Sequence, residues 1–164
     1  MNTQGHELFE AFHRIKKASM GRIHKSLLQN LKPHEFFMLS TLKKLLTEQA
    51  EEASNHQTDI PPGIKVSELS RVISISMPGV SQTISTLERH GYVKRIASKK
   101  DRRLVYVNLT DSGEQLEADV SKSCYQIYNE AALLLGEQDT QSLIYLLDKL
   151  TGAFDQIDHN QSDY

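Results

Sequence analysis

The chain of 164 residues has a single cysteine and no long apolar run, and both absences restrict what it can be. One cysteine, Cys124, excludes an intrachain disulfide. The sequence has neither the pattern of a signal peptide nor the run of about 18 apolar residues that a membrane-spanning helix needs. We therefore expect a soluble, cytoplasmic protein with no membrane partner, whose length suits one domain with a sizeable core.

The sequence also lacks the motifs of common reaction centres. It has no glycine-rich phosphate-binding loop and no nucleophile motif. Its seven histidines include no pair four residues apart, and none is spaced from the cysteine as zinc ligands are. We therefore expect a protein that is not an enzyme and that holds no metal or other cofactor.

Charge is nearly balanced over the whole chain but not along it. The formal net charge of −2 argues against a uniformly basic nucleic-acid binder. Between residues 89 and 103, seven basic side chains accompany a single aspartate, a local balance of +6 that leaves −8 for the rest. An acidic body with one basic segment would approach DNA in one orientation. The basic residues are Arg89, Lys94, Arg95, Lys99, Lys100, Arg102 and Arg103.

Two short helices are predicted ahead of most of this basic segment. After a short strand over 64–66, Ser67 is a suitable N-cap for a helix that ends near residue 73. A turn follows, and Ser76 then caps a helix that runs to about residue 90 and stops at Gly91.

The second of these helices is amphipathic. With about 3.6 residues per turn, Val80, Ile84 and Leu87 share one side and should face a core. The opposite side is polar and could bond base edges and phosphates, so we predict that it binds DNA. The predicted contacts of this recognition helix are Ser76, Pro78, Gln82, Ser85, Thr86 and Arg89.

A cationic hairpin follows the recognition helix. Residues 93–97 and 104–109 have the pattern of strands, and the link between them is too charged to be buried. The predicted DNA contacts of this wing are Lys99, Lys100, Asp101, Arg102 and Arg103. Arginines of such a wing suit the narrow minor groove, while Asp101 would orient an arginine or a backbone amide. The helices and hairpin together outline a winged helix-turn-helix.

Longer helices flank this unit. Apolar spacing predicts helices over 7–31 and 33–48. Residues 50–63 are polar, acidic and end in a double proline, which predicts a mobile loop that is either a regulatory segment or a tolerated surface insertion. Another helix, capped by Thr110 or Asp111, should end before Gly136, and a last helix follows.

Apolar seams on the first and last helices predict a partner helix, with packing inside the chain as the alternative. The predicted interface residues are Leu8, Phe12, Leu143, Leu147, Leu150 and Phe154. Cys124 lies on an apolar stripe of the helix that ends before Gly136, so we interpret it as a buried structural residue. The alternative is that Cys124 makes the protein a redox-sensing regulator.

These elements predict a mainly α fold with a small antiparallel β wing, in one structural domain. Residues 1–34 would form an N-terminal dimerisation helix, residues 35–112 the winged helix-turn-helix, and residues 113–164 the C-terminal dimerisation helices.

Three motifs of the chain resemble the MarR family of transcription regulators. They are Asp101-x-Arg103-x-x-x-Val107-x-Leu109-Thr110, Ser67-Glu68-Leu69 and Leu87-Glu88-x-x-Gly91-Tyr92-Val93. The resemblance implies a homodimer that binds a pseudo-palindromic operator of double-stranded DNA, with half-sites about one helical turn apart. It also implies that Asp101 and Arg103 form a structural and minor-groove pair. Many members carry charged residues where this chain has Gln82, Ser85 and Thr86.

The resemblance further implies a repressor released by a small-molecule effector that favours a non-binding spacing of the two heads. The hypothetical pocket would take polar contacts from His13 or Lys17 and aromatic lining from Phe36 or Phe37, although solvated helix residues are the alternative. Another interpretation of the whole chain is a winged-helix module for protein interaction without sequence-specific DNA binding.

Overall fold

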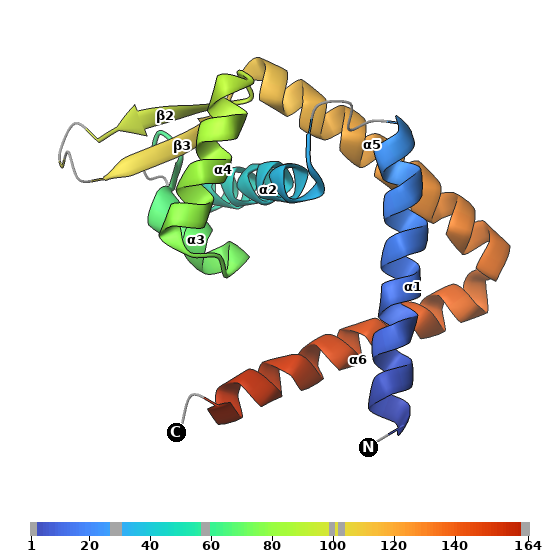
Figure 1. Ribbon diagram of the computed structural model, residues 1–164. Helices are drawn as coiled ribbons and strands as arrows, with labels where there is room; N and C mark the ends of the chain where they lie inside the picture. The colour runs from blue at the N-terminus through green and yellow to red at the C-terminus, as the bar shows by residue number, and fades with distance from the viewer. Residues whose placement is uncertain (1–2, 27–30, 57–59, 99–100, 102–103, 162–164) are drawn as a thin grey trace. The chain divides into compact units, whose positions relative to one another are not determined.

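The computed structural model describes residues 3–26, 31–56, 60–98, 101 and 104–161. Within these ranges, long helices flank a winged helix-turn-helix (Figure 1). The elements in chain order are α1 (Thr3–Ser26), α2 (Pro33–His56), β1 (Ile64–Lys65), α3 (Val66–Ile73), α4 (Met77–Arg89), β2 (Val93–Ala97), β3 (Val105–Leu109), α5 (Asp111–Leu135) and α6 (Glu137–Gln161). The predicted mainly α fold with a small antiparallel wing is confirmed. No helix of the described ranges combines the length and apolarity that crossing a membrane requires.

The chain divides into two compact units, Met1–Ser123 and Cys124–Tyr164. The boundary between these units lies within α5. The first half of α5 buries Gly113 and Val120, whereas its second half leaves Leu133 and Leu134 exposed. One long helix therefore contributes to both units.

An apolar core fills the first unit. It draws on α2, the sheet, α3, α4 and the first half of α5. The largest fully buried side chains are Met38, Leu39, Leu42, Ile64, Leu69, Val80, Ile84, Leu87, Val107 and Val120. Removing apolar surface from water contributes about 25 cal/mol of stabilisation per Å². This packing holds α3 and α4 in position.

The three strands form an antiparallel sheet in the order β1-β3-β2. In the hairpin, Val93 pairs with Leu109 and Ala97 with Val105, which confirms the predicted strand pair apart from a start one residue later in β3. The inward-facing Val93, Val107 and Leu109 are buried, as the alternation of side chains in a half-buried sheet requires.

Helix α2 is longer than the sequence predicted. The helix was expected to end at residue 48, with a loop over 50–63, yet α2 continues to His56. Ala50, Glu51 and Glu52 are good helix formers, and Ala53 is buried within the first unit. The acidic, polar composition obscured this continuation, and only the later part of the predicted loop is non-helical among the described residues.

The start of α3 also differs from the prediction. Lys65, with φ −65° and ψ 137°, is the N-cap, so the helix begins at Val66 and not after Ser67. The chain passes from β1 directly into α3 without a connecting loop. Ile64 and Val66, on the two sides of this junction, are both buried in the core. Ser76 is the N-cap of α4 as predicted, although its hydroxyl makes no capping hydrogen bond.

Candidate nucleic-acid interface

Helix α4 places one face in the core and the opposite face outward. Val80, Ile84 and Leu87 are 0 to 1% exposed, which confirms their predicted direction. The outward face is the one predicted to bind DNA. Of its predicted contacts, Ser76, Pro78, Gln82, Ser85 and Arg89 are exposed and Thr86 is half-buried.

Two tight turns hold α4 at its ends. Ser74 adopts the left-handed conformation at φ 56°, and the N–H groups of Ser74 and Ile75 bond the carbonyls of Arg71 and Ser70. At the other end Gly91, at φ 77°, stops the helix as predicted, with the backbone N–H of Tyr92 donating to the carbonyl of Leu87 at 2.9 Å. The turn that ends α3 and the turn that ends α4 are therefore each closed by paired backbone groups, which fixes where α4 begins and ends.

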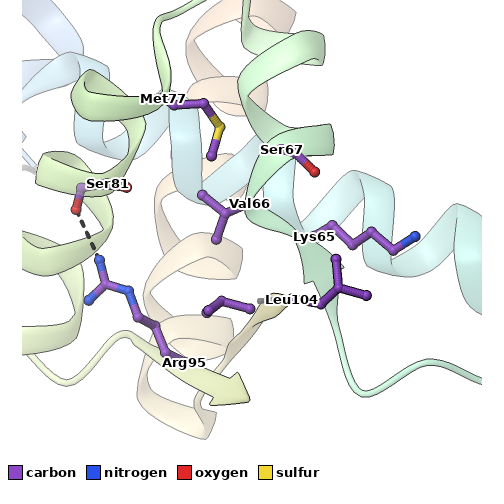
Figure 2. A pocket seen from close by; sticks show the side chains of 8 residues that line it. Lys65, Val66, Ser67, Met77, Ser81, Arg95 and Leu104 are labelled. Atoms are coloured by element: carbon purple, nitrogen blue, oxygen red, sulfur yellow. Dashed lines mark hydrogen bonds between the residues drawn. The ribbon is translucent and has the colours of Figure 1, made fainter. Parts of the chain in front are cut away.

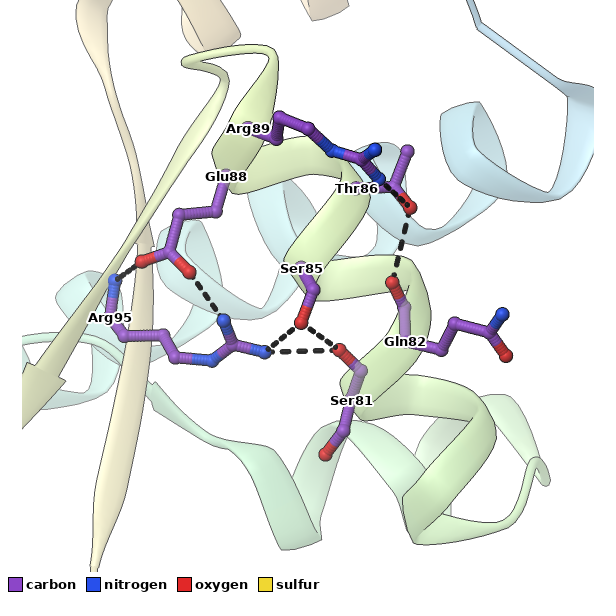
Figure 3. Close-up of polar contacts among 7 residues, drawn as sticks. All are labelled: Ser81, Gln82, Ser85, Thr86, Glu88, Arg89 and Arg95. Atoms are coloured by element: carbon purple, nitrogen blue, oxygen red, sulfur yellow. Dashed lines mark hydrogen bonds and ion pairs between the residues drawn. The ribbon is translucent and has the colours of Figure 1, made fainter.

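An arginine of the wing is fastened to α4 (Figure 3). The Arg95 guanidinium forms an ion pair with Glu88, and the Arg95 backbone N–H donates to the same carboxylate at 3.2 Å. A second guanidinium nitrogen donates to the carbonyl of Ser81 and to Oγ of Ser85, both at 3.0 Å. Strand β2 is thus tied to three successive turns of the recognition helix.

Sequence reasoning missed this role of Arg95. It counted Arg95 with the basic residues of the segment and did not include Glu88 among the predicted contacts of the recognition helix. The ion pair instead consumes both charges, so Arg95 serves to position α4. Two opposite charges seven residues apart, on either side of the helix-ending Gly91, were the signal that could have revealed the pair.

A hollow of roughly 230 Å³ lies beside this arginine (Figure 2). Arg95 reaches across one side of it to Ser81, while Met77 and Val66 face it from the two helices. Its lining is Lys65, Val66, Ser67, Met77, Ser81, Arg95, Leu104 and Val105. The hollow lies between the start of α3 and β2. On the side of the hollow that α4 forms, the hydrogen bonds of Arg95 join β2 to α4.

The base of the wing is closed by short contacts. The backbone N–H of Thr110 donates to the carbonyl of Tyr92 at 3.1 Å, and the N–H of Gly113 donates to Oγ1 of Thr110 at 3.1 Å, which confirms Thr110 as a helix cap. A Cβ on Gly113 would lie 1.9 Å from the Tyr92 carbonyl oxygen. This close approach holds the base of the hairpin against the start of α5.

The tip of the wing is only partly described. Asp101 is exposed, its backbone N–H donates to Oγ of Ser98 at 3.2 Å, and its carbonyl accepts from the N–H of Leu104 at 3.0 Å. The four other predicted wing contacts lie outside the described residues; they are Lys99, Lys100, Arg102 and Arg103. Their role on DNA, and the predicted pairing of Asp101 with an arginine, stay predictions.

Three of the four predicted ligand-binding residues line one open hollow of the first unit. His13 and Lys17 of α1 and Phe37 of α2 surround about 770 Å³ together with Lys16, Pro33 and His34. Phe36, the fourth, is half-buried and is not part of this lining. The hollow has cationic, imidazole and aromatic groups at its edge, a set that can contact an amphipathic molecule.

The predicted interface side chains are uncovered in the single chain. Leu8, Phe12, Leu143, Leu147 and Phe154 are exposed, and Leu150 is half-buried. We predicted that Cys124 is buried, but it is half-buried. The reason is that the apolar stripe that contains it is covered only toward Val120. At the other end of that stripe Leu134 is 90% exposed.

Comparisons with known proteins agree with this geometry. The MarR family model matches residues 61–105, which span α3, α4 and most of the hairpin. The chain is similar to YfiV of Bacillus subtilis (strain 168), described as an HTH-type transcriptional regulator, with 26% identity over 102 residues that cover 62% of this chain and 61% of YfiV. It is also similar to YwaE of the same organism, with 43% identity over 51 residues that cover 31% of this chain and 28% of YwaE.

The alignments therefore span less than two thirds of either relative. Among solved structures, the fold is similar to that of FabT from Streptococcus pneumoniae in complex with DNA. The TM-score is 0.71 at 16% sequence identity, with 94% of this chain and 97% of FabT covered, so this likeness establishes the fold alone. The winged helix-turn-helix therefore matches the MarR family model over residues 61–105, and the fold of the chain is similar to that of FabT.

Proposed function

We propose that this protein is a transcription regulator that binds a specific operator in double-stranded DNA as a homodimer, and that it acts in the cytoplasm as a repressor. Members of the family are transcription regulators, and FabT was solved with DNA. The observation that carries the proposal is the outward face of α4. It presents Gln82, Ser85 and Arg89 beside a hairpin whose tip sequence is strongly basic.

The physical basis is a division of tasks between two surfaces. A helix of this width fits the major groove of B-DNA, where amide and hydroxyl groups distinguish base pairs. The basic hairpin supplies phosphate or minor-groove contacts that are independent of most of the sequence. Because the rest of the chain is acidic, DNA would be repelled from the remaining surface.

The dimer is proposed from the uncovered apolar seams. Leu143, Leu147 and Phe154 of α6 are 39 to 56% exposed, an arrangement that favours contact with a second apolar surface. A two-fold dimer would present two copies of α4, and a pseudo-palindromic operator matches that symmetry.

A small amphipathic effector is proposed for the hollow that His13, Lys17 and Phe37 line. An acidic, aromatic molecule would place its charge at Lys17 and its ring at Phe37. If it bound better to a dimer whose two heads are wrongly spaced for the operator, it would release the repressor. Calorimetric titration of an aromatic carboxylate such as salicylate tests this, and equal affinity in His13→Ala and Lys17→Ala variants would remove both residues from the site.

Electrophoretic mobility shift against the DNA upstream of the protein's own gene tests DNA binding. At moderate salt we expect a discrete complex that a hundredfold mass excess of random duplex does not displace. A complex that random duplex removes as readily as the unlabelled upstream fragment would contradict the proposal. It would instead favour a winged helix used for protein contact.

A further inference from the structure

Hydrogen-bond donors are unevenly available on the outward face of α4. A serine or threonine hydroxyl has one proton to donate and two acceptor sites. Ser85 donates that proton to the carbonyl of Ser81 at 2.8 Å, and Thr86 donates to the carbonyl of Gln82 at 3.2 Å. While these contacts persist, neither hydroxyl can donate to a base.

Both hydroxyl oxygens also receive an arginine N–H. Arg95 donates to Ser85 at 3.0 Å, and Arg89 donates to Thr86 at 3.3 Å. The two contacts differ in how firmly the arginine is held. Arg89 is exposed and lies on the same helix, whereas Arg95 is anchored from β2 by the Glu88 carboxylate. Arg95 therefore keeps Ser85 as an acceptor with one site left.

Gln82 differs from its neighbours. Its side chain is exposed and points away from the network, and no hydrogen bond of its amide group occurs in the described part of the chain (Figure 3). The amide offers a donor and an acceptor side by side, which is the pattern that matches N6 and N7 of adenine in the major groove. A serine oxygen limited to accepting instead favours the amino group of cytosine or adenine.

We propose that Gln82 determines specificity by reading one adenine in each half-site, and that Arg95 is the positioning residue that holds Ser85 as a hydrogen-bond acceptor beside it. Gln82 and Ser85 lie three residues apart on one helix face, so they would meet neighbouring base pairs. The inference rests on the proposed function, because it assumes that this face enters the major groove.

The geometry of Arg95 suggests a variant that separates position from charge. A guanidinium has five donors in a planar fork, and here it contacts Glu88, Ser81 and Ser85 together. A lysine at this position would retain the positive charge beside Glu88 but would lack the fork that spans all three partners. Arg95→Lys should therefore free Ser85 while preserving much of the link between β2 and α4.

The test is selection of bound duplexes from a randomised pool, with base preference measured at every position for the full-length wild type and four variants. For Gln82→Ala we expect the adenine preference to flatten at one position per half-site, with roughly 5- to 150-fold weaker binding of the wild-type site. For Ser85→Ala and Arg95→Lys we expect loss of preference at the neighbouring position only. Gln115→Ala, which removes an exposed amide from α5, is the matched control and should change no position.

The outcomes separate the inference from the function on which it rests. An enriched site whose adenines survive Gln82→Ala, or that has no adenine there, would overturn the role of Gln82. Uniform weakening at all positions in Arg95→Lys, together with an unchanged profile in Ser85→Ala, would show that Arg95 is merely structural. Failure of the wild type to enrich any sequence would overturn DNA recognition itself and this inference with it.

Discussion

The winged helix of the first unit buries most of its large apolar side chains, whereas the terminal helix α6 leaves most of its own exposed. In the first unit Leu39 and Leu69 are 0% exposed, and core side chains come from α2, α3, α4, α5 and the sheet. In α6, Leu147 is 39% exposed and Phe154 56%. The winged helix therefore buries its hydrophobic surface within the chain, whereas α6 does not.

This difference indicates that the two regions acquire stability from different sources. A core that is closed within one chain gives a stability that does not depend on protein concentration. An apolar seam that a second copy covers gives a stability that rises with concentration, since assembly follows mass action. Each of the following predictions tests whether the core within one chain and the interface between two copies contribute independently.

The largest effect is expected on assembly. In Leu143→Glu/Leu147→Glu, two seam positions become charged, and two-fold symmetry doubles each loss. At about 1.5–3 kcal/mol per leucine that leaves a buried interface, the dimer should weaken by roughly three orders of magnitude or more. Analytical ultracentrifugation should then show a monomer at micromolar concentration, where we expect the wild type to be a dimer.

Gln156→Glu is the control for this pair, because it places the same charge on an exposed polar position of α6. It should leave the dimer intact. A double variant that sediments like the wild type would mean that these leucines do not form the interface.

A smaller but still large effect is expected in the core. Leu69→Ala removes a side chain that is 0% exposed, so it should lower the free energy of unfolding by about 2–5 kcal/mol. Thermal unfolding at two protein concentrations checks this. The loss should be the same at both if the core belongs to one chain, and a loss that vanishes at high concentration would break the comparison.

Next in size is a steric effect at the base of the wing. A Cβ at position 113 would meet the Tyr92 carbonyl oxygen at 1.9 Å, and backbone atoms cannot give way cheaply. We expect Gly113→Ala to lower the free energy of unfolding by about 1–3 kcal/mol, as overpacking does. In Gly5→Ala the new Cβ meets nothing within 4 Å, so the denaturant midpoint of this control should not fall.

The smallest effect is expected from a single wing charge. Arg103→Ala should weaken DNA binding broadly and reduce the slope of log affinity against log salt by about one unit, since one cationic contact with DNA is lost. Fluorescence anisotropy over a salt series measures this slope. The sedimentation and the melting temperature of the protein should stay unchanged, and an unaltered slope would exclude Arg103 from the cationic contacts with DNA.

Local patterns were enough to predict the reading elements. Three-residue and four-residue spacing placed Val80, Ile84 and Leu87 in the core, and the strand-like pattern of residues 93–97 predicted β2 with its observed bounds. Both patterns arise from backbone geometry, which acts over a few residues. Gly91 at the end of α4 was predictable for the same reason.

Features that depend on tertiary packing were not predictable in this way. The end of α2 was placed too early because an acidic stretch resembles a loop until Ala53 is seen to be buried. The role of Arg95 depends on β2 folding back against α4, which brings Glu88 and Ser85 within reach. Composition only counted that arginine in the charge of the basic segment, whereas its contacts show that it ties β2 to α4.

The most direct test of the proposed recognition by α4 is a ratio of dissociation constants. Duplex DNA carrying the selected site is compared with a scrambled duplex of equal length at the same moderate salt concentration. We predict a ratio of at least about 10³, together with its collapse when five base pairs are inserted between the half-sites, because one α4 then faces the wrong side of the duplex. A ratio near one, unaffected by the insertion, would contradict sequence-specific recognition by a dimer.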